Sequence, residues 1–251
     1  MKIDQLKSRI ESSVNLDFGG IFSESIELFK KVWVQGLVTF LIMMACIMPF
    51  YLIIYIPMFA AGFNDPQSFE SDQPPVWFAV LMIVFMPIFL LAVMTISNGL
   101  MAAFYRICKL KDKEEMGKDD YFRFLKGENL KKSFVLGLYA TGLTFLGMLA
   151  CGIGVIYVMV PVSLFPVFLA FRQDLTAAEI VKASFALGNK NWLVIFGLLL
   201  VCGFLANLGV IACYIGLFFT AMFGKIPLYF VYKNSLGFDA DEQHEQPILE
   251  A

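Results

Sequence analysis

Four long stretches without any charged residue limit what this chain can fold into more strongly than any other feature of its sequence. They are residues 32–64, 73–105, 133–171 and 191–224. Each is longer than the run of about 18 apolar residues that indicates a membrane-spanning helix. Charged residues make up 16% of the chain, whereas they make up roughly 25% of a typical soluble domain. The sequence therefore predicts an all-α, polytopic integral membrane protein.

The lengths of these runs predict how often the chain crosses the membrane. As one helix, residues 133–171 would be about 58 Å long at 1.5 Å per residue, nearly twice the roughly 30 Å hydrocarbon core of a bilayer. This run is therefore expected to turn at Cys151–Gly154, and the run from Trp192 to Tyr232 to turn near Asn207–Gly209. Six transmembrane helices in three hairpins follow, at residues 34–60, 76–105, 134–151, 154–171, 192–208 and 210–232.

The positions of the basic residues predict the orientation of the chain. All nineteen Lys and Arg residues lie at the N-terminal segment, the loops after the second and fourth spans, or the C-terminal end of the sixth span. The three loops on the opposite side contain none. Because basic residues are enriched in cytoplasmic loops, both termini are expected in the cytoplasm. Residues 1–33 then form a cytoplasmic amphipathic segment, residues 34–232 the transmembrane domain, and residues 233–251 an acidic, disordered tail.

A nine-residue pattern, Ser-x-x-Leu-x-x-Lys-x-Trp, occurs twice, at residues 25–33 and 184–192. Each copy closes an amphipathic run and precedes a long apolar one. A Lys side chain stays among lipid headgroups, and the indole ring of Trp favours the membrane interface. The pattern therefore predicts four interfacial anchors, which are Lys31, Trp33, Lys190 and Trp192.

Each hairpin is expected to follow an amphipathic helix that lies on the cytoplasmic membrane surface. Residues 21–31 and 176–189 carry apolar stripes at helical spacing before their tryptophans. Thr176 and Glu179 form a capping-box pattern at the start of the latter helix. A third surface helix is expected within residues 119–132. The chain is thus interpreted as three repeated units, each a surface helix followed by two spans.

The predicted hairpins end in an aromatic residue followed by a basic one, at Tyr105–Arg106, Phe171–Arg172 and Tyr232–Lys233, and prolines interrupt the spans. Together with the Trp-ended surface helices, this arrangement resembles the membrane domain attached to some bacterial glycerophosphoryl diester phosphodiesterases, and related stand-alone bacterial membrane proteins of unknown function. The resemblance covers most of residues 18–235. It implies a location in the bacterial inner membrane. It implies no catalysis, because that family's metal-binding Glu and His set lies in a separate soluble barrel without a counterpart here.

No catalytic, cofactor-binding or metal-binding residue is expected. The five cysteines are isolated, the one histidine lies in the tail, and no carboxylate lies within a predicted span, although ion-coupled transporters generally need one. Lys225 is the one charged residue well inside a span, about 12 Å from the end marked by Lys233 at 1.5 Å per residue. It either snorkels to the headgroups or faces a cavity that receives an anionic headgroup, with Arg172 as the second contact.

Three classes of function are compatible with the sequence. The favoured class is a non-catalytic scaffold or accessory protein that shapes the membrane or assists another membrane protein. The alternative is a carrier or permease for a lipid or another small amphiphile, which the prolines, Lys225 and the internal repeat support; an intramembrane enzyme ranks last. A cavity that reaches Lys225 would favour the carrier, and a packed core with an exposed apolar flank the scaffold. The expected partners are membrane lipids, anionic ones included, and a membrane protein, but no nucleic acid.

Overall fold

The computed structural model describes residues 3–64, 76–150, 152–209 and 215–238. Every regular element within these residues is a helix, which confirms the all-α fold class. The elements are α1 (Ile3–Ser12), α2 (Phe18–Asn64), α3 (Val76–Asp112), the 3-10 turn η2 (Arg123–Leu125), α4 (Gly127–Leu149), α5 (Ile153–Ser163), α6 (Phe165–Phe171), α7 (Ala177–Lys190), α8 (Trp192–Leu208), α9 (Ile215–Thr220), the 3-10 turn η4 (Phe223–Lys225) and α10 (Ile226–Leu236).

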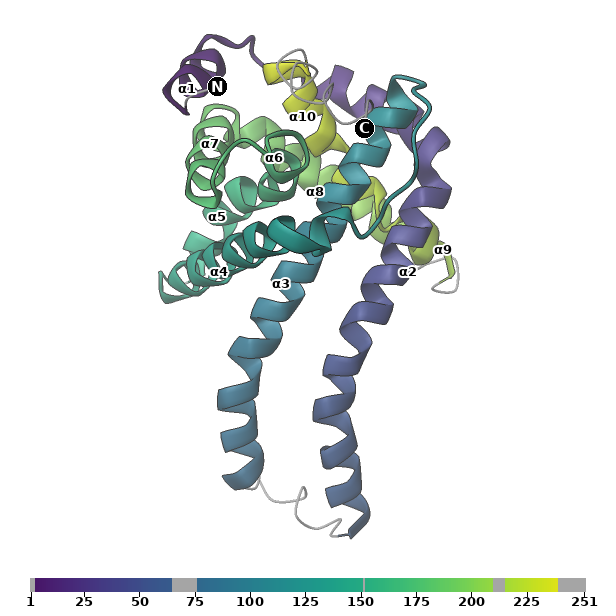
Figure 1. Ribbon diagram of the computed structural model, residues 1–251, viewed down its shortest axis with the longest axis vertical. Coiled ribbons are helices and arrows are strands. Elements are labelled where there is room, and N and C mark those ends of the chain that lie inside the picture. The colour runs from purple at the N-terminus through teal and green to yellow at the C-terminus, as the bar shows by residue number, and fades with distance from the viewer. Residues whose placement is uncertain (1–2, 65–75, 151, 210–214, 239–251) are drawn as a thin grey trace.

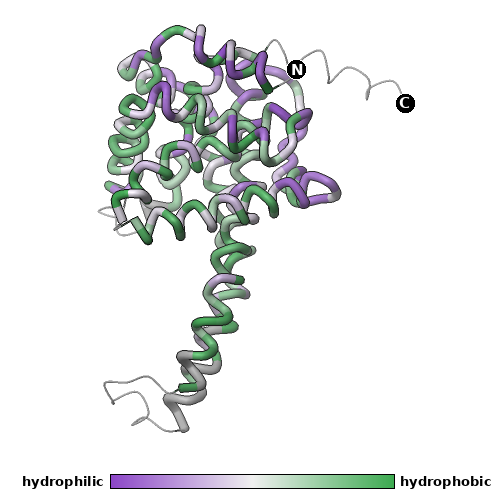
Figure 2. The backbone as a smooth tube through the Cα atoms, turned by 90° about the vertical axis from the view of Figure 1, so that its left-hand side faces the viewer, coloured by the Kyte–Doolittle hydropathy of each residue, from purple (hydrophilic) through white to green (hydrophobic). Residues whose placement is uncertain are grey.

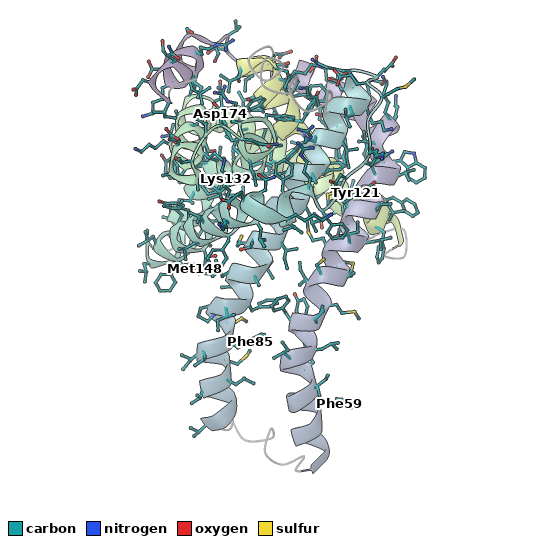
Figure 3. All side chains as sticks on the ribbon, in the orientation of Figure 1. Phe59, Phe85, Tyr121, Lys132, Met148 and Asp174 are labelled. Carbon is teal, nitrogen blue, oxygen red and sulfur yellow. The ribbon has the colours of Figure 1, made fainter. Side chains whose placement is uncertain are left out.

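Helices α2 and α3 form a hairpin that extends well beyond the other helices, which gather around its opposite end (Figure 1). Large apolar side chains such as Ile53, Phe59 and Ile83 are exposed on the extended part (Figure 3). Aromatic rings join the two helices there, with the ring of Phe89 centred 5.2 Å from that of Tyr51. An exposed apolar hairpin of this kind is suited to a lipid environment, because its backbone polar groups are satisfied within each helix.

Four segments of the described chain are long and apolar enough to cross a membrane: Phe18–Ile53, Val80–Asp112, Gly127–Leu149 and Ile153–Phe171. Helices α7 and α8, which meet at a 90° bend, form a fifth if they are counted as one span. Hydrophobic residues follow the extended hairpin, whereas hydrophilic residues gather at the end of the molecule farthest from its tip (Figure 2). These are the features of a multi-pass membrane protein.

Helix α10 lies in the core of the gathered helices. Its residues from Ile226 to Tyr232 are all buried, and it contacts α2, α3, α6 and α8. The ring of Tyr232 meets that of Phe168 in α6 edge to face, with 5.4 Å between the ring centres. Much of the apolar surface of the last predicted span is therefore covered by protein.

The predicted span 210–232 is not one continuous helix in its described part. Helix α9 ends at Thr220, η4 occupies Phe223–Lys225, and α10 begins at Ile226 with Pro227 in its first turn. Proline removes a hydrogen bond from a helix interior but fits the first turn, so it begins a new helix here. With 11 residues, α10 is only about 16 Å long. Residues 210–214 lie outside the described residues.

The predicted surface helix 21–31 is not a separate element. Helix α2 runs without a break from Phe18 past Trp33 into the extended hairpin. The first helix-weakening residue after Trp33 is Gly36, and one glycine destabilises a helix interior by only about 1 kcal/mol. A Cβ at Gly36 would lie 3.1 Å from Cβ of Met222. The glycine therefore lets Met222 pack closely against α2 and does not bend the helix.

The second copy of the repeated pattern does form a corner. Helix α7 ends at Lys190, Asn191 leaves the helical conformation, and α8 begins at Trp192. The capping box is confirmed, because Thr176 Oγ1 accepts a hydrogen bond from Glu179 N and Thr176 N donates to Glu179 Oε2. The hydrogen bonds from Thr176 hold the pKa of the Glu179 carboxyl below its ordinary value. Whether α7 lies on a membrane surface stays a prediction.

The third predicted surface helix, within residues 119–132, does not form. The 3-10 turn η2 occupies Arg123–Leu125, and residues 127–132 belong to α4, which begins at Gly127 with a φ of +55°. The expected turn between the third and fourth spans is confirmed at Gly152, whose φ is +79°. Beyond it, the predicted span 154–171 is divided at Leu164 into α5 and α6. Among the described residues, the three expected units therefore differ in secondary structure.

Candidate functional site

A cavity of about 560 Å³ lies between α5, α8 and the segment that leads into α10. Its walls are mainly apolar, formed by side chains that include Met159, Phe196, Leu199 and Ala206. Leu200 also lines it and is 55% exposed, so the cavity opens on the exposed side of α8. The one charged residue that lines it is Lys225.

Small residues bring the backbone of η4 against α8 and so place Lys225 in this cavity. A Cβ at Gly224 would lie 3.2 Å from Cα of Gly203, so a larger residue would push the two segments apart. The hydroxyl of Thr220 donates to the carbonyl of Ala206 at 2.6 Å, which joins the end of α9 to α8. On the other side, the buried Tyr105 hydroxyl donates to the carbonyl of Lys225 at 3.1 Å. The backbone of Lys225 is therefore held from two sides.

The side-chain amine of Lys225 is the group that this cavity leaves available for binding. It has no ion-pair or hydrogen-bond partner among the described residues, and the side chain is exposed. The two polar residues beside it already donate to their own helices: Asn207 Nδ2 to Gly203 O at 2.7 Å, and Ser163 Oγ to Val160 O at 2.7 Å. An amine at an apolar wall can bind an anionic group and an apolar chain together.

Arg172, predicted as the second contact of the same site, lies elsewhere. It is 4% exposed and donates from Nε and from one terminal nitrogen to the two carboxylate oxygens of Asp174, at 3.0 and 3.1 Å. Burial alone would raise the pKa of the Asp174 carboxyl, but hydrogen bonds and the charge of Arg172 outweigh it and lower that pKa. Phe171 packs on Phe238 beyond the C-terminal end of α10, whereas Lys225 precedes its first turn. Arg172 therefore has a protein partner of its own and does not line the cavity at Lys225, and its role as a second headgroup contact stays a prediction.

The two predicted lysine anchors both bind protein groups. The amine of Lys190 donates to the carbonyls of Ile10 at 2.8 Å, Glu11 at 3.0 Å and Ser13 at 2.5 Å. It therefore closes the C-terminal end of α1, where the helix leaves carbonyls without partners. Lys31 pairs with Glu114 across 2.9 Å. Both amines therefore have protein partners, and their role as interfacial anchors stays a prediction.

The two tryptophans have different surroundings. Trp33 is 42% exposed and its ring lies 5.8 Å from that of Phe219. Trp192 stacks on Phe196, with 4.8 Å between ring centres, and its indole nitrogen donates to Tyr157 O at 3.2 Å. Trp192 therefore stacks on a residue that lines the cavity. Their position at a membrane interface stays a prediction.

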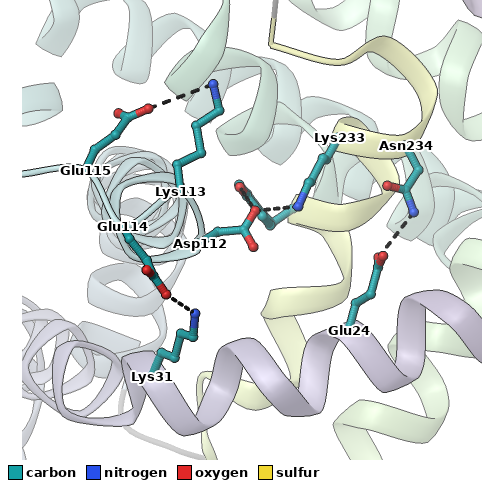
Figure 4. A network of polar contacts seen from close by, with 9 residues as sticks. Glu24, Lys31, Asp112, Lys113, Glu114, Glu115, Lys233 and Asn234 are labelled. Atoms are coloured by element: carbon teal, nitrogen blue, oxygen red, sulfur yellow. Dashed lines mark hydrogen bonds and ion pairs between the residues drawn. The ribbon is translucent and has the colours of Figure 1, made fainter.

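One polar cluster was missed in the sequence (Figure 4). Asp112 Oδ2 accepts hydrogen bonds from the hydroxyl of Tyr229 at 2.8 Å and the amine of Lys233 at 2.5 Å. Asn234, next in α10, lies 3.4 Å from a carboxylate oxygen of Glu24 in α2. Only the fold brings these three helices together, so nothing in the local sequence around Asp112 could have revealed the cluster.

The described residues contain no group of three or more His, Cys, Asp and Glu side chains placed to hold a metal ion. Comparisons of this chain with protein-family models, with curated proteins and with solved structures found no match. The cavity at Lys225 is therefore the feature that bears on a candidate function.

Proposed function

We propose that this chain is a non-catalytic membrane protein that binds an anionic amphiphile, with the anionic group at the amine of Lys225 and the apolar chain along α8. The observation that carries the proposal is the amine of Lys225, which has no partner among the described residues and lies in a cavity with mainly apolar walls. Its volume of about 560 Å³ falls within the roughly 300 to 1,000 Å³ of typical small-ligand sites. An amine beside apolar walls matches both halves of an amphiphile.

Of the two non-enzymatic classes, this cavity favours a carrier of a lipid or another small amphiphile. The opening beside Leu200 supports this choice, because an amphiphile could enter the cavity through it from the adjacent surface of the bilayer. The scaffold or accessory role remains the second candidate. The extended α2–α3 hairpin favours it, since its exposed apolar side chains could pack against another membrane protein as well as against lipid.

The location belongs to the same proposal. We place the protein in the bacterial inner membrane with both termini in the cytoplasm. The distribution of all nineteen basic residues supports this orientation. It puts Lys225, which lies eight residues before Lys233, toward the cytoplasmic leaflet, where anionic lipids attract basic groups.

Native mass spectrometry of the purified full chain tests the proposal. We expect Lys225→Leu to lower the retention of an added anionic lipid about tenfold, because a hydrogen bond to a charged group contributes roughly 1.5 to 3 kcal/mol. Lys182→Leu is the matched control, since Lys182 is an exposed lysine of α7 outside the cavity. Lys225→Arg should keep most of the binding. Equal retention by Lys225→Leu and Lys182→Leu would contradict the proposal.

A further inference from the structure

The α4–α5 hairpin does not lie alongside α2 and α3. Figure 1 shows α4 running across α3, and the two helices meet where Gly137 faces Thr95. A Cβ at Gly137 would lie 2.7 Å from Thr95 Oγ1 and 3.1 Å from Thr95 N. The backbones therefore touch at this crossing. This contact fixes the position of α4 along α3.

The part of α3 beyond this crossing is about as long as a bilayer is thick. Between the crossing at Thr95 and its first residue, Val76, α3 continues for a further length of about 30 Å at 1.5 Å per residue. The hydrocarbon core of a bilayer is also about 30 Å thick. If this part of α3 crosses the membrane, α4 lies at the surface on the side of Arg106 and the other basic residues that follow α3.

The turn between α4 and α5 is apolar and exposed. Met148, Leu149 and Ile153 around it are 65%, 68% and 74% exposed. A turn that faces water is usually built from polar residues together with Gly and Pro. The loop between α2 and α3, in contrast, contains Asp65, Glu70 and Asp72. A turn lined by large apolar side chains is therefore suited to lipid and unsuited to an aqueous compartment.

We infer that the α4–α5 hairpin binds the cytoplasmic leaflet of the bilayer as a half-inserted element whose turn stays in lipid and does not reach the opposite side. Both of its ends are then cytoplasmic, just as they would be for two complete spans. The distribution of Lys and Arg is therefore the same for both arrangements, and the sequence alone does not separate them. This inference does not depend on the proposed amphiphile site.

Single cysteines in a variant without the five native cysteines test the inference in the intact membrane. The positions are Leu149→Cys and Ile153→Cys at the turn, with Ser71→Cys as the control for the outer side and Lys118→Cys for the cytoplasm. We expect a membrane-impermeant maleimide to label Ser71→Cys from outside and Lys118→Cys in inside-out vesicles. Neither turn variant should be labelled from either side within the time needed to label the controls.

A spin label at the turn positions gives the second measurement. In lipid, it should be relaxed more strongly by dissolved oxygen than by a water-soluble nickel complex. Labelling of both turn cysteines from outside would show two complete spans, and labelling in inside-out vesicles would place the turn in the cytoplasm; either result overturns the inference. Failure of Ser71→Cys to label from outside would instead contradict the proposed orientation. The lipid-retention experiment on Lys225 is unaffected by any of these outcomes.

Discussion

Three basic residues that look alike in the sequence have three different roles. Lys190 closes the end of α1, the buried Arg172 pairs with the more exposed Asp174, and Lys225 faces a cavity and has no partner within the described part of the chain. Each role depends on what the fold places within about 3 Å of the charged nitrogens, because a hydrogen bond requires that distance. Lys225 therefore differs from Lys190 and Arg172, whose charged nitrogens donate to protein groups.

At the residue scale, we predict that Lys190→Met loosens α1. Its amine donates to three carbonyls and to the hydroxyl of Ser13. Losing a charged donor of this kind should lower the local stability of α1 by about 1.5 to 3 kcal/mol. Amide hydrogen exchange over residues 3–12 should therefore be roughly 10 to 100 times faster.

Lys182→Met is the control for this prediction, because Lys182 lies exposed on the same helix α7. Its exchange profile over residues 3–12 should match that of the unmodified protein. If Lys190→Met also left exchange in α1 unchanged, the burial of Leu6 and Ile10 would be holding the helix without help from Lys190.

At the element scale, glycines bring α4 and α5 into backbone contact next to their turn. A Cβ at Gly147 would lie 2.8 Å from Val155 N and 2.9 Å from the carbonyl carbon of Gly154. Backbone atoms cannot move aside as the end of a flexible side chain can. Small residues that let helix backbones approach closely are typical of helix pairs in membranes. The hairpin is therefore held by a contact in which any side chain would interfere.

Two substitutions in α4 should have opposite effects for this reason. Gly147→Ala should lower the stability of the purified protein by about 1 to 3 kcal/mol, as overpacking usually does. Gly142→Ala adds a Cβ with no atom within 4 Å and should raise stability by about 0.4 to 1 kcal/mol, because alanine restricts the unfolded chain. Thermal denaturation in detergent measures both. A higher melting temperature for Gly147→Ala would rule out the close contact.

At the scale of the whole molecule, Asp112 connects the end of α3 to α10, and the neighbouring pair Glu24–Asn234 connects α10 to α2 (Figure 4). The side chain of Asp112 is only 19% exposed. A carboxylate that is largely removed from water interacts strongly with its donors, and the donors are left without a partner when it is lost. This cluster therefore fixes how the extended hairpin is joined to the core helix.

We predict that Asp112→Asn lowers stability by about 1 to 3 kcal/mol, since the amide keeps the shape of the carboxylate but not its charge. Glu114→Gln provides the matched control two residues later. Glu114 pairs with Lys31 while both side chains remain at least half exposed, so its removal should have little effect. Thermal denaturation of both variants in detergent should show a lower melting temperature for Asp112→Asn than for Glu114→Gln. Equal losses of stability would show that the two carboxylates contribute alike.

The sequence by itself determined the properties that depend on local composition. Uncharged runs predicted helices in a membrane, Thr176 and Glu179 predicted a capping box, and Gly152 predicted a turn, because each needs only residues close together in the chain. Lys225 was also found this way, since a charge inside an apolar run stands out in any fold.

The tertiary structure decided everything that depends on which segments meet. It showed that α2 continues through Trp33, that a short buried helix starts with Pro227 in its first turn, and that Arg172 pairs with Asp174. It also chose the partners of Lys31, Lys190 and Asp112 from residues more than 80 positions away. An apolar run has the same composition whether lipid or protein covers it, so only the packing could show that α10 is buried in the core.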